Sequence, residues 1–205
     1  MTCRRCRCAG SATSGWWLHA DTLFGDGPRR DATGEQRGLG RPAVLDPATA
    51  RERARRELAA GTSVQVLIVD DHGGLQRAVR LPASACTDRA TMVEAVRAAP
   101  LTPLTTDRYA PTTAITRHVH AAAPTCSAYD CSRTATSCDL DHDEPWPRGP
   151  TAVTNLDPKC RRHHQAKTHA VVRTRLHIGP GRAVTWTYRS GLTATTRPEP
   201  LPGCH

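Results

Sequence analysis

Large aromatic side chains are scarce in this chain. Among its 205 residues there are four Trp, three Tyr and one Phe, and only two Met. So few large side chains give little volume for an extensive hydrophobic core, and the length allows one or two small domains. We therefore expect links other than apolar packing to provide part of the stability.

Long apolar runs are missing as well. No stretch approaches the roughly 18 apolar residues of a membrane-spanning helix, and the N-terminal segment MTCRRCRCAGSATSG has no hydrophobic region of signal-peptide length. These absences predict a cytoplasmic protein that has no membrane partner. In the cytoplasm thiols stay reduced, so cysteines are available to bind metals.

Lysine is almost absent from the basic residues. Only Lys159 and Lys167 stand among 28 Lys and Arg, and the formal net charge is +9. The preference for Arg, together with abundant Ala and Pro, is typical of GC-rich coding sequence. The basic excess is nevertheless concentrated, because residues 151–189 contain eight Lys or Arg against the single acid Asp157. A basic segment of this kind favours contacts with a phosphate backbone.

Three cysteines and a histidine form two close pairs in a polar stretch rich in Pro and Gly. Four residues separate Cys126 from Cys131, and two separate Cys160 from His163. Tetrahedral zinc takes thiolate and imidazole ligands at such spacings. A Cys2His2 finger has about twelve residues between its pairs, whereas 28 residues lie between these two pairs. The alternative, buried cysteines without a metal, fits poorly with so polar a segment.

The insert between the two pairs carries four acidic residues around His142. They are Asp139, Asp141, Asp143 and Glu144. Carboxylates packed this densely repel one another unless a cation or a base neutralises them. The alternation over residues 139–142 predicts the end of a short strand. We interpret Asp139, Asp143 and Glu144 as a solvated acidic rim rather than as metal ligands.

A helix is predicted after Asn155 and Leu156. Asp157 is expected as its N-cap and Pro158 as its first helical residue. Successive residues of a helix are about 100° apart. His163 can therefore face the zinc while His164 faces the strand that contains Asp141 and His142.

The order of these residues resembles that of the HNH endonucleases, which have the ββα-metal fold. The shared parts are Cys126, Cys131, Asp141-His142, Pro145, Asn155-Leu156, Cys160, His163-His164 and Lys167. The phrases RYAPTTAITRHVHA, CDLDHDEPWPRGPTAVTNL and CRRHHQAKTHA also resemble the C-terminal HNH domain of a large actinobacterial repeat family. In that family the HNH domain follows a long domain of unknown function. The resemblance covers roughly residues 100–190.

The resemblance implies metal-dependent hydrolysis of DNA phosphodiester bonds. It assigns the general base to His142, and it assigns a single Mg or Mn ion to Asp141 and His164. It gives Asn155 the task of steadying the strand and loop that aim the base. The structural zinc would be held by Cys126, Cys131, Cys160 and His163.

A non-enzymatic function remains as the alternative. The chain can also be a zinc-stabilised nucleic-acid-binding module without catalysis, or a decayed fragment of a longer HNH protein. A zinc scaffold alone has no need of Asp141, His142 and His164 together, and this weighs in favour of the enzyme.

Basic residues on the motif helix and on a following hairpin are the expected DNA contacts. The hairpin is predicted from strands at residues 171–178 and 182–188, and Arg173 and Arg175 should share one of its faces. The full set of expected DNA-binding residues is Lys159, Arg161, Arg162, Lys167, Arg173 and Arg175.

The fold class expected from these patterns is α+β, with a zinc-stapled ββα-metal module between a helix-hairpin-helix region and a β-hairpin. Four segments are predicted: a disordered or poorly ordered N-terminus (residues 1–45), a shortened upstream α+β region (46–110), the HNH nuclease domain (111–190) and a flexible tail (191–205). The upstream region should contain a helix at 47–60, strands at 62–70 and 75–81, and a helix at 87–99.

Some conspicuous residues receive no role in the site. Trp146 lies between two prolines and is expected to pack on the hairpin rather than to stack on a base. Cys138 is expected to be a small buried apolar residue rather than a spare ligand. Cys3, Cys6 and Cys8 have no partner pair nearby that would complete a metal site.

Overall fold

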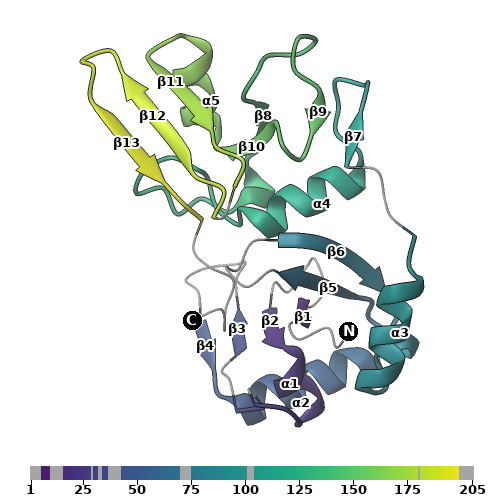
Figure 1. Cartoon of the computed structure of the whole chain (residues 1–205). Helices are drawn as coiled ribbons and strands as arrows, with labels where there is room; N and C mark the ends of the chain where they lie inside the picture. Colours follow the sequence, from purple (N-terminus) through teal and green to yellow (C-terminus); the bar gives the residue numbers. More distant parts are fainter. Residues whose placement is uncertain are drawn as a thin grey trace. The chain divides into compact units, whose positions relative to one another are not determined.

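The chain divides into two units that mix helices with antiparallel sheets, as the α+β class requires (Figure 1). The computed structural model describes residues 6–9, 16–28, 30–31, 34–36, 43–69, 75–100, 104–179 and 181–198. Unit 1 extends to Pro100 and also takes in residues 200–205, while unit 2 comprises Leu101–Glu199. The boundary at Pro100 therefore precedes the predicted one at residue 110.

Unit 1 is built on a six-stranded antiparallel sheet with the strand order β4-β3-β2-β1-β5-β6. Its strands are β1 (Cys6–Ala9), β2 (Trp16–His19), β3 (Gly34–Gln36), β4 (Ala43–Leu45), β5 (Val64–Val69) and β6 (Leu75–Leu81). Apolar residues of β2, β5 and β6 pack against three helices: α1 (Ala20–Phe24), α2 (Pro47–Ala59) and α3 (Arg89–Ala98).

The predicted helix-hairpin-helix is present in unit 1. Asp46 caps α2 by accepting hydrogen bonds from the backbone N–H of Ala48 and Thr49, at 3.1 and 3.0 Å. β5 and β6 pair antiparallel, and a 3₁₀ turn, η1 (Ala83–Cys86), leads into α3. Residues 70–74, which join β5 to β6, lie outside the described residues.

The prediction that residues 1–45 are poorly ordered is wrong for the described part of that range. Leu18, Ala20 and Leu23 are buried and belong to the core of unit 1. β1 lies between β2 and β5 in the sheet. The strands β1 to β4 are only three or four residues long, too short for a clear periodic pattern, and the pairing of β1 with β5 joins segments far apart in the chain.

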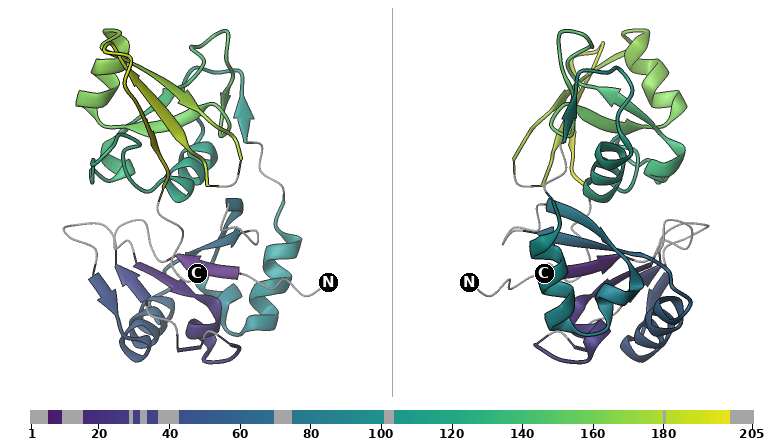
Figure 2. Two further views of the ribbon diagram at one scale, coloured as in Figure 1. Left: turned by 60° about the vertical axis from the view of Figure 1, so that its left-hand side comes forward. Right: turned by 90° about the vertical axis from the view of Figure 1, so that its right-hand side faces the viewer.

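Unit 2 places a short hairpin, a helix and a three-stranded sheet around two small cores (Figure 2). Its first part consists of β7 (Thr105–Thr106), α4 (Thr113–Ala122), η2 (Ala135–Ser137), β8 (Asp139–His142) and β9 (Thr151–Ala152). Its second part consists of β10 (Leu156–Lys159), α5 (Arg161–Thr168), β11 (Val172–Leu176), β12 (Val184–Tyr188) and β13 (Thr193–Thr196). β8 pairs with β10, and β7 pairs with β9.

The predicted start of the motif helix is wrong. Asp157 and Pro158 lie in β10, opposite Asp141 and Leu140 of β8, and the helix α5 begins only at Arg161. Cys160 occupies the N-cap position instead. Pairing with β8 overrides the local preference of an Asp-Pro sequence for a helix start.

The C-terminal sheet extends the predicted hairpin by one strand. β11 pairs with β12 as expected, but β13 pairs with the other edge of β12. Part of the segment predicted as a flexible tail from residue 191 is therefore a strand, and residues 199–205 lie outside the described part. Trp186 of β12 is 1 % exposed and donates a hydrogen bond from Nε1 to the Ser127 carbonyl at 2.9 Å.

A neutral histidine is buried in unit 2. His118 lies on α4 beside the core residue Val119, and no described group forms a hydrogen bond with its Nδ1. Burial lowers the pKa of His118 from 6.5 to about 4, and the positive charge of Arg182 adds to the effect. Arg182 is itself partly buried, and its guanidinium donates to the carbonyl groups of Val153 and Leu156.

We predict that His118 makes unit 2 less stable in mild acid. Between its unfolded pKa of 6.5 and its folded value of about 4, the proton binds only to the unfolded chain. The free energy of unfolding should therefore fall as the pH drops through this window, by on the order of 3 kcal/mol from this group. Urea unfolding of wild type and His118→Leu at several pH values, followed by tryptophan fluorescence, measures the effect. The difference between the two proteins should change across the window, and parallel curves would contradict the prediction.

Candidate functional site

Three thiols and one imidazole converge in unit 2, as the sequence predicted. One ligand atom from each of Cys126, Cys131, Cys160 and His163 lies within 4.8 Å of the others. The Nδ1 atom of His163 is 3.4 Å from the Cys126 sulfur and 3.2 Å from the Cys160 sulfur. For tetrahedral zinc with ordinary bond lengths, a sulfur and a nitrogen ligand are about 3.6 Å apart. The cluster can therefore hold a metal ion.

The local fold explains why these four side chains meet. Residues 126–131 form a tight loop in which the Cys131 N–H donates to the Ala128 carbonyl, and Asp130 has a φ of 54°. The Cys160 N–H points at the Cys126 sulfur, 3.3 Å away. The ring of Trp186 covers His163 edge-on, with the ring centroids 5.8 Å apart.

The thiols of the cluster differ in acidity. Burial raises the pKa of Cys126 to about 12. Burial also opposes ionisation of Cys160, but a hydrogen bond from the His163 backbone leaves its pKa below the ordinary value of 9.0. Buried thiolates require a nearby cation, and a metal ion at the centre of the four ligands would provide that charge.

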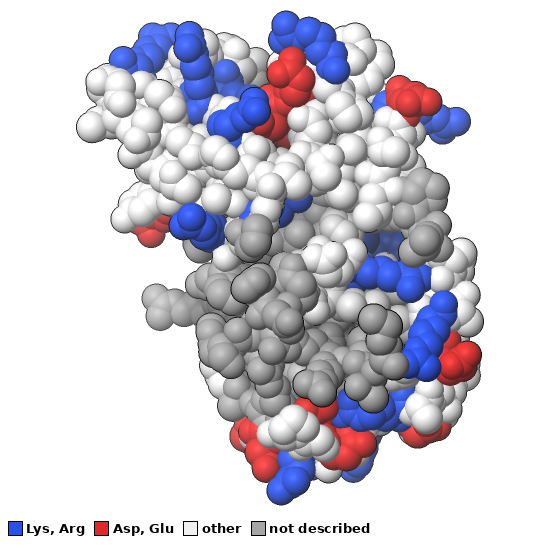
Figure 3. Space-filling view, in the orientation of Figure 1, with Lys and Arg blue, Asp and Glu red and all other residues white. Residues whose placement is uncertain are grey.

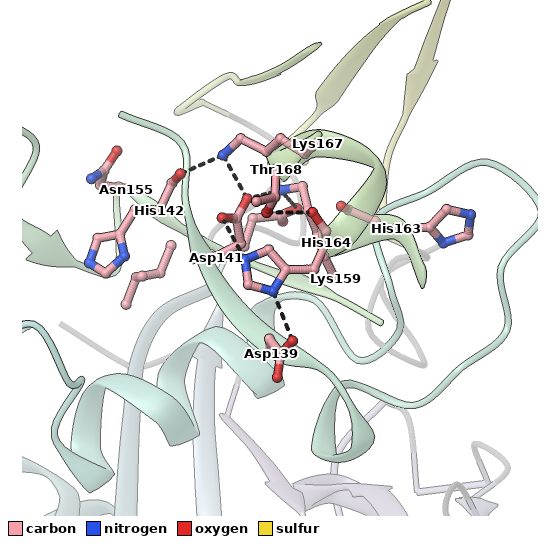
Figure 4. Close-up of polar contacts among 12 residues, drawn as sticks. Asp139, Asp141, His142, Asn155, Lys159, His163, His164, Lys167 and Thr168 are labelled. Atoms are coloured by element: carbon pink, nitrogen blue, oxygen red, sulfur yellow. Dashed lines mark hydrogen bonds and ion pairs between the residues drawn. The ribbon is translucent and has the colours of Figure 1, made fainter. Parts of the chain in front are cut away.

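A second polar cluster lies between β8 and α5 (Figure 4). The ring of His164 points toward Asp139 and Asp141, whereas the ring of His163, its neighbour on α5, points away from them. Asp139 accepts a hydrogen bond from His164 Nδ1 at 2.8 Å, and this bond is the main reason that the pKa of Asp139 is lowered. With Nδ1 engaged by Asp139, Nε2 is the ring nitrogen that could bind a metal ion.

The second ring nitrogen of His164, Nε2, faces the carboxylate of Asp141. His164 Nε2 and Asp141 Oδ1 are 3.4 Å apart, a separation suited to two ligands that share one cation at about 2.1 Å each. Asp139 then has the position of the carboxylate that commonly orients a metal-binding histidine. Asp141 and His164 therefore lie close enough to share a divalent ion, and the ion itself stays a prediction, while Asp139 is more than a solvated rim.

The other oxygen of Asp141 is occupied by two lysines. Its Oδ2 lies 2.6 Å from Lys167 Nζ and 3.2 Å from Lys159 Nζ. Lys159 is 0 % exposed and also pairs with Asp157 at 3.1 Å. Burial tends to lower the pKa of Lys159, but the two carboxylates outweigh it and the pKa is raised. The prediction that Lys159 contacts DNA is wrong, because its ammonium group is an internal structural charge.

His142 lies at the end of β8 with its ring on the side away from His164 (Figure 4). Its Nε2 is 2.8 Å from Thr151 Oγ1, and that hydroxyl donates its only proton to the Tyr109 carbonyl. His142 Nε2 must therefore be the protonated nitrogen, which leaves Nδ1 free to accept a proton. Burial lowers the pKa of His142, and the effect outweighs the nearby Asp141 charge, so the ring is neutral near pH 7.

Asn155 holds the loop that follows His142. Its side-chain oxygen accepts from the Glu144 N–H at 2.8 Å, and its Nδ2 donates to the carbonyls of Glu144 and Pro150 at 2.9 Å each. Gly149 makes this arrangement possible, because a Cβ there would lie 2.5 Å from Asn155 Nδ2. These contacts agree with a positioning role rather than with metal binding.

The remaining predicted DNA contacts lie on the surface of unit 2, with one exception. Arg161, Arg162, Arg173 and Arg175 are exposed. Lys167 is mostly buried and directed to Asp141 and to the His142 carbonyl. On the face shown in Figure 3, Asp and Glu atoms near β8 have Lys and Arg atoms on both sides.

Sequence reasoning missed Thr151 and undervalued Asp139. Side chains alternate along a strand, so Asp139 and Asp141 had to share the face of β8 that meets α5. That signal was present in the sequence. No sequence signal marks Thr151, because its contact with His142 depends on the conformation of the loop that connects β8 to β9.

Comparison with known proteins identifies relatives but no activity. No family model and no solved structure matches the chain. Similar curated proteins, all named uncharacterized, include Rv2100 of Mycobacterium tuberculosis (strain ATCC 25618 / H37Rv), 38 % identical over 90 residues, and Rv3776 of the same strain, 34 % identical over 100 residues. MT2160 of strain CDC 1551 / Oshkosh matches as Rv2100 does. The matches cover 44 % and 47 % of this chain but only 16 % and 19 % of these relatives.

None of the helices within the described residues has the length and apolar character needed to cross a bilayer.

We predict that the four-ligand cluster binds a metal on which unit 2 depends for stability. Cys160→Ser should remove the bound metal and abolish the cooperative unfolding of unit 2, since such sites contribute on the order of 10 kcal/mol to folding. Elemental analysis and thermal unfolding with and without a chelator measure both effects. Cys138→Ser is the matched control, because Cys138 packs beside the cluster but is not one of its four ligands. A wild type that carries no metal and is unaffected by chelator would contradict the prediction.

Proposed function

We propose that unit 2 is a metal-dependent endonuclease of the HNH class that hydrolyses phosphodiester bonds of DNA. The observation that carries the proposal is that two histidines near Asp141 have different surroundings. His164 presents Nε2 to the Asp141 carboxylate at 3.4 Å, and His142 is held neutral with Nε2 donating to Thr151. One imidazole is thus prepared as a ligand and the other as a base.

His142 has the properties that a general base requires. Its Nδ1 would take a proton from a water molecule as the water oxygen bonds to phosphorus. The bond from phosphorus to the 3′ oxygen then breaks, and the leaving oxygen gains a proton from solvent. Asn155 and Gly149 keep the loop after His142 in place, while Thr151 fixes the tautomer of the ring.

Asp141 and His164 would hold the catalytic ion. A bound Mg or Mn ion would supply the positive charge that stabilises the phosphorane and the leaving oxygen. Asp139 would keep the His164 ring in the orientation that this requires. Lys167, bonded to Asp141 Oδ2, would add a further positive charge beside the phosphate.

The thiol and imidazole cluster is proposed to be a structural zinc site. Three soft sulfur ligands and one imidazole favour zinc over the hard cations. All four positions are filled by protein ligands. Such a site leaves no open position for substrate, which supports a structural rather than a catalytic role.

The exposed arginines are the proposed DNA contacts. Arg173 and Arg175 extend from one face of β11 toward solvent, opposite the buried Val172 and Leu176. The same face of the neighbouring strand carries Thr185 and Thr187 rather than acidic residues. Such a face can follow a phosphate backbone without reading bases.

A non-catalytic DNA-binding module remains the second candidate. Both Lys159 and Lys167 pair with Asp141 Oδ2, so much of the carboxylate charge is already neutralised without a divalent ion. The chain also aligns with less than a fifth of the length of its curated relatives. Nuclease activity is therefore proposed for unit 2, and for a longer protein that contains such a unit it is equally a proposal.

We predict that His142→Ala strongly slows cleavage but leaves folding intact. Supercoiled plasmid should be nicked or linearised by wild type with Mg or Mn, and the rate should fall by about 10²- to 10⁴-fold in the variant, as for loss of an acid-base group. His164→Ala should instead lower the affinity for the catalytic ion, so that a higher concentration of Mg or Mn restores part of the rate.

The matched control is His169→Ala, because the His169 side chain is exposed at the end of α5. It should cleave like wild type, and all three variants should keep the wild-type zinc content and melting temperature. A wild type that cuts no DNA with any divalent ion would overturn the enzyme in favour of the binding module. Equal cleavage by His142→Ala would remove His142 from the reaction.

We predict that replacing Arg173 and Arg175 with Ala weakens binding to DNA of any sequence. Each lost phosphate contact should reduce the slope of log affinity against log salt by about 0.9. Titration of duplex DNA at several salt concentrations measures this slope. The control is a double Ala variant at Arg55 and Arg56, two exposed arginines on α2, which changes the net charge equally. An equal effect of both double variants would show a general charge effect and contradict a specific role of β11.

A further inference from the structure

Two exposed aromatic residues lie beside His142. Tyr109 is 64 % exposed and Trp146 is 43 % exposed. The sequence favoured packing for Trp146, yet neither residue belongs to the buried cores of unit 2. Large aromatic side chains are scarce in this chain, so two adjacent ones left in contact with water need an explanation.

The two rings form a corner whose inner end is the proposed base. Tyr109 stacks on His142 with ring centroids 5.4 Å apart and an angle of 23° between the planes. Trp146 meets Tyr109 nearly at right angles, with centroids 5.8 Å apart and an angle of 75°. One face of Tyr109 therefore covers His142, and much of the remaining ring surface is open to solvent.

Polar and charged groups border this corner. Arg108 precedes Tyr109 and is exposed, and Arg148 is exposed on the loop that contains Trp146. Arg148 forms an ion pair with Glu144 at 3.1 Å, which is weak at so exposed a position. Flat aromatic faces with arginines beside them are the usual platform for bases of a single nucleic-acid strand, whose phosphates the arginines contact.

We propose that Tyr109 and Trp146 stack an unpaired nucleobase next to the phosphate that His142 faces. Bases inside a regular duplex are stacked on one another and cannot reach such a corner. The preferred substrate is therefore DNA with unpaired nucleotides at the cleavage position, either single-stranded or locally opened. The inference rests on the proposed function for its choice of DNA, but it concerns recognition rather than catalysis.

Binding of short oligonucleotides to the whole 205-residue chain tests the proposal. The probes are a fluorescent oligothymidylate, a strand of equal length and charge with abasic residues in place of thymidines, and a hairpin duplex of equal charge. No Mg or Mn is added, so cleavage does not interfere. Wild type should bind the base-bearing strand about 10-fold or more tightly than the abasic strand, the size expected for one or two stacked bases.

Variants then assign the difference to the two rings. Tyr109→Leu keeps an apolar cover on His142 but removes the aromatic face, and Trp146→Leu does the same at the second position. Each should bring the affinity for oligothymidylate close to that for the abasic strand, while Trp146→Phe should retain most of it. Tyr129→Leu is the matched control, since Tyr129 is 70 % exposed but lies in the loop of the thiol cluster.

The outcomes separate this proposal from the nuclease itself. Equal binding of base-bearing and abasic strands by wild type would overturn it, as would wild-type affinity in Tyr109→Leu and Trp146→Leu, or a preference for the duplex. Each of these results could occur in a protein that cleaves plasmid. Base-dependent binding that disappears in both Leu variants would support the platform even if no cleavage were found.

Discussion

The ammonium group of Lys159 is fully buried, and the arrangement of unit 2 around β8 and β10 depends on neutralising it. An unpaired charge in such a position would cost several kcal/mol. The antiparallel register places Asp157 directly opposite Asp141, and two adjacent carboxylates would repel each other without a cation between them. Lys159 satisfies both acids at once. The hairpin and its buried charges therefore stabilise each other.

Because of the same buried charge, the two carboxylate oxygens of Asp141 have different roles. Its Oδ2 pairs with two lysines, whereas its Oδ1 faces His164. The fold therefore fixes the carboxylate before any ion binds, which reduces the conformational entropy that binding would cost. On the other face of the strand, His142 is fixed by Thr151 rather than by a charge. Ion pairs thus hold Asp141 on one face of β8, and a hydrogen bond to a hydroxyl group holds His142 on the other face.

The sequence predicted features that depend on the spacing of residues along the chain. It did not predict features that depend on the pairing of strands. The four-ligand cluster follows from two short spacings, and α2 follows from its Asp46 cap and its length. Asp157 was assigned to a helix start because Asp-Pro is a strong local signal, but the contacts with β8 that decide its conformation are not local. For the same reason Lys159 looked like a surface residue of a helix. The strands before residue 45 are only three or four residues long, which is too short to show a clear periodic pattern.

Adjacent histidines on α5 serve two different centres, His163 with the thiols and His164 with the carboxylates. A single inserted or deleted residue between Cys160 and His163 would turn both rings by about 100° relative to Cys160. The two rings could then no longer face their two centres at once, and at least one centre would lose its histidine. This segment can consequently diverge in evolution by substitution but not by a change in length, unlike the loop between β11 and β12, where an insertion would disturb neither histidine.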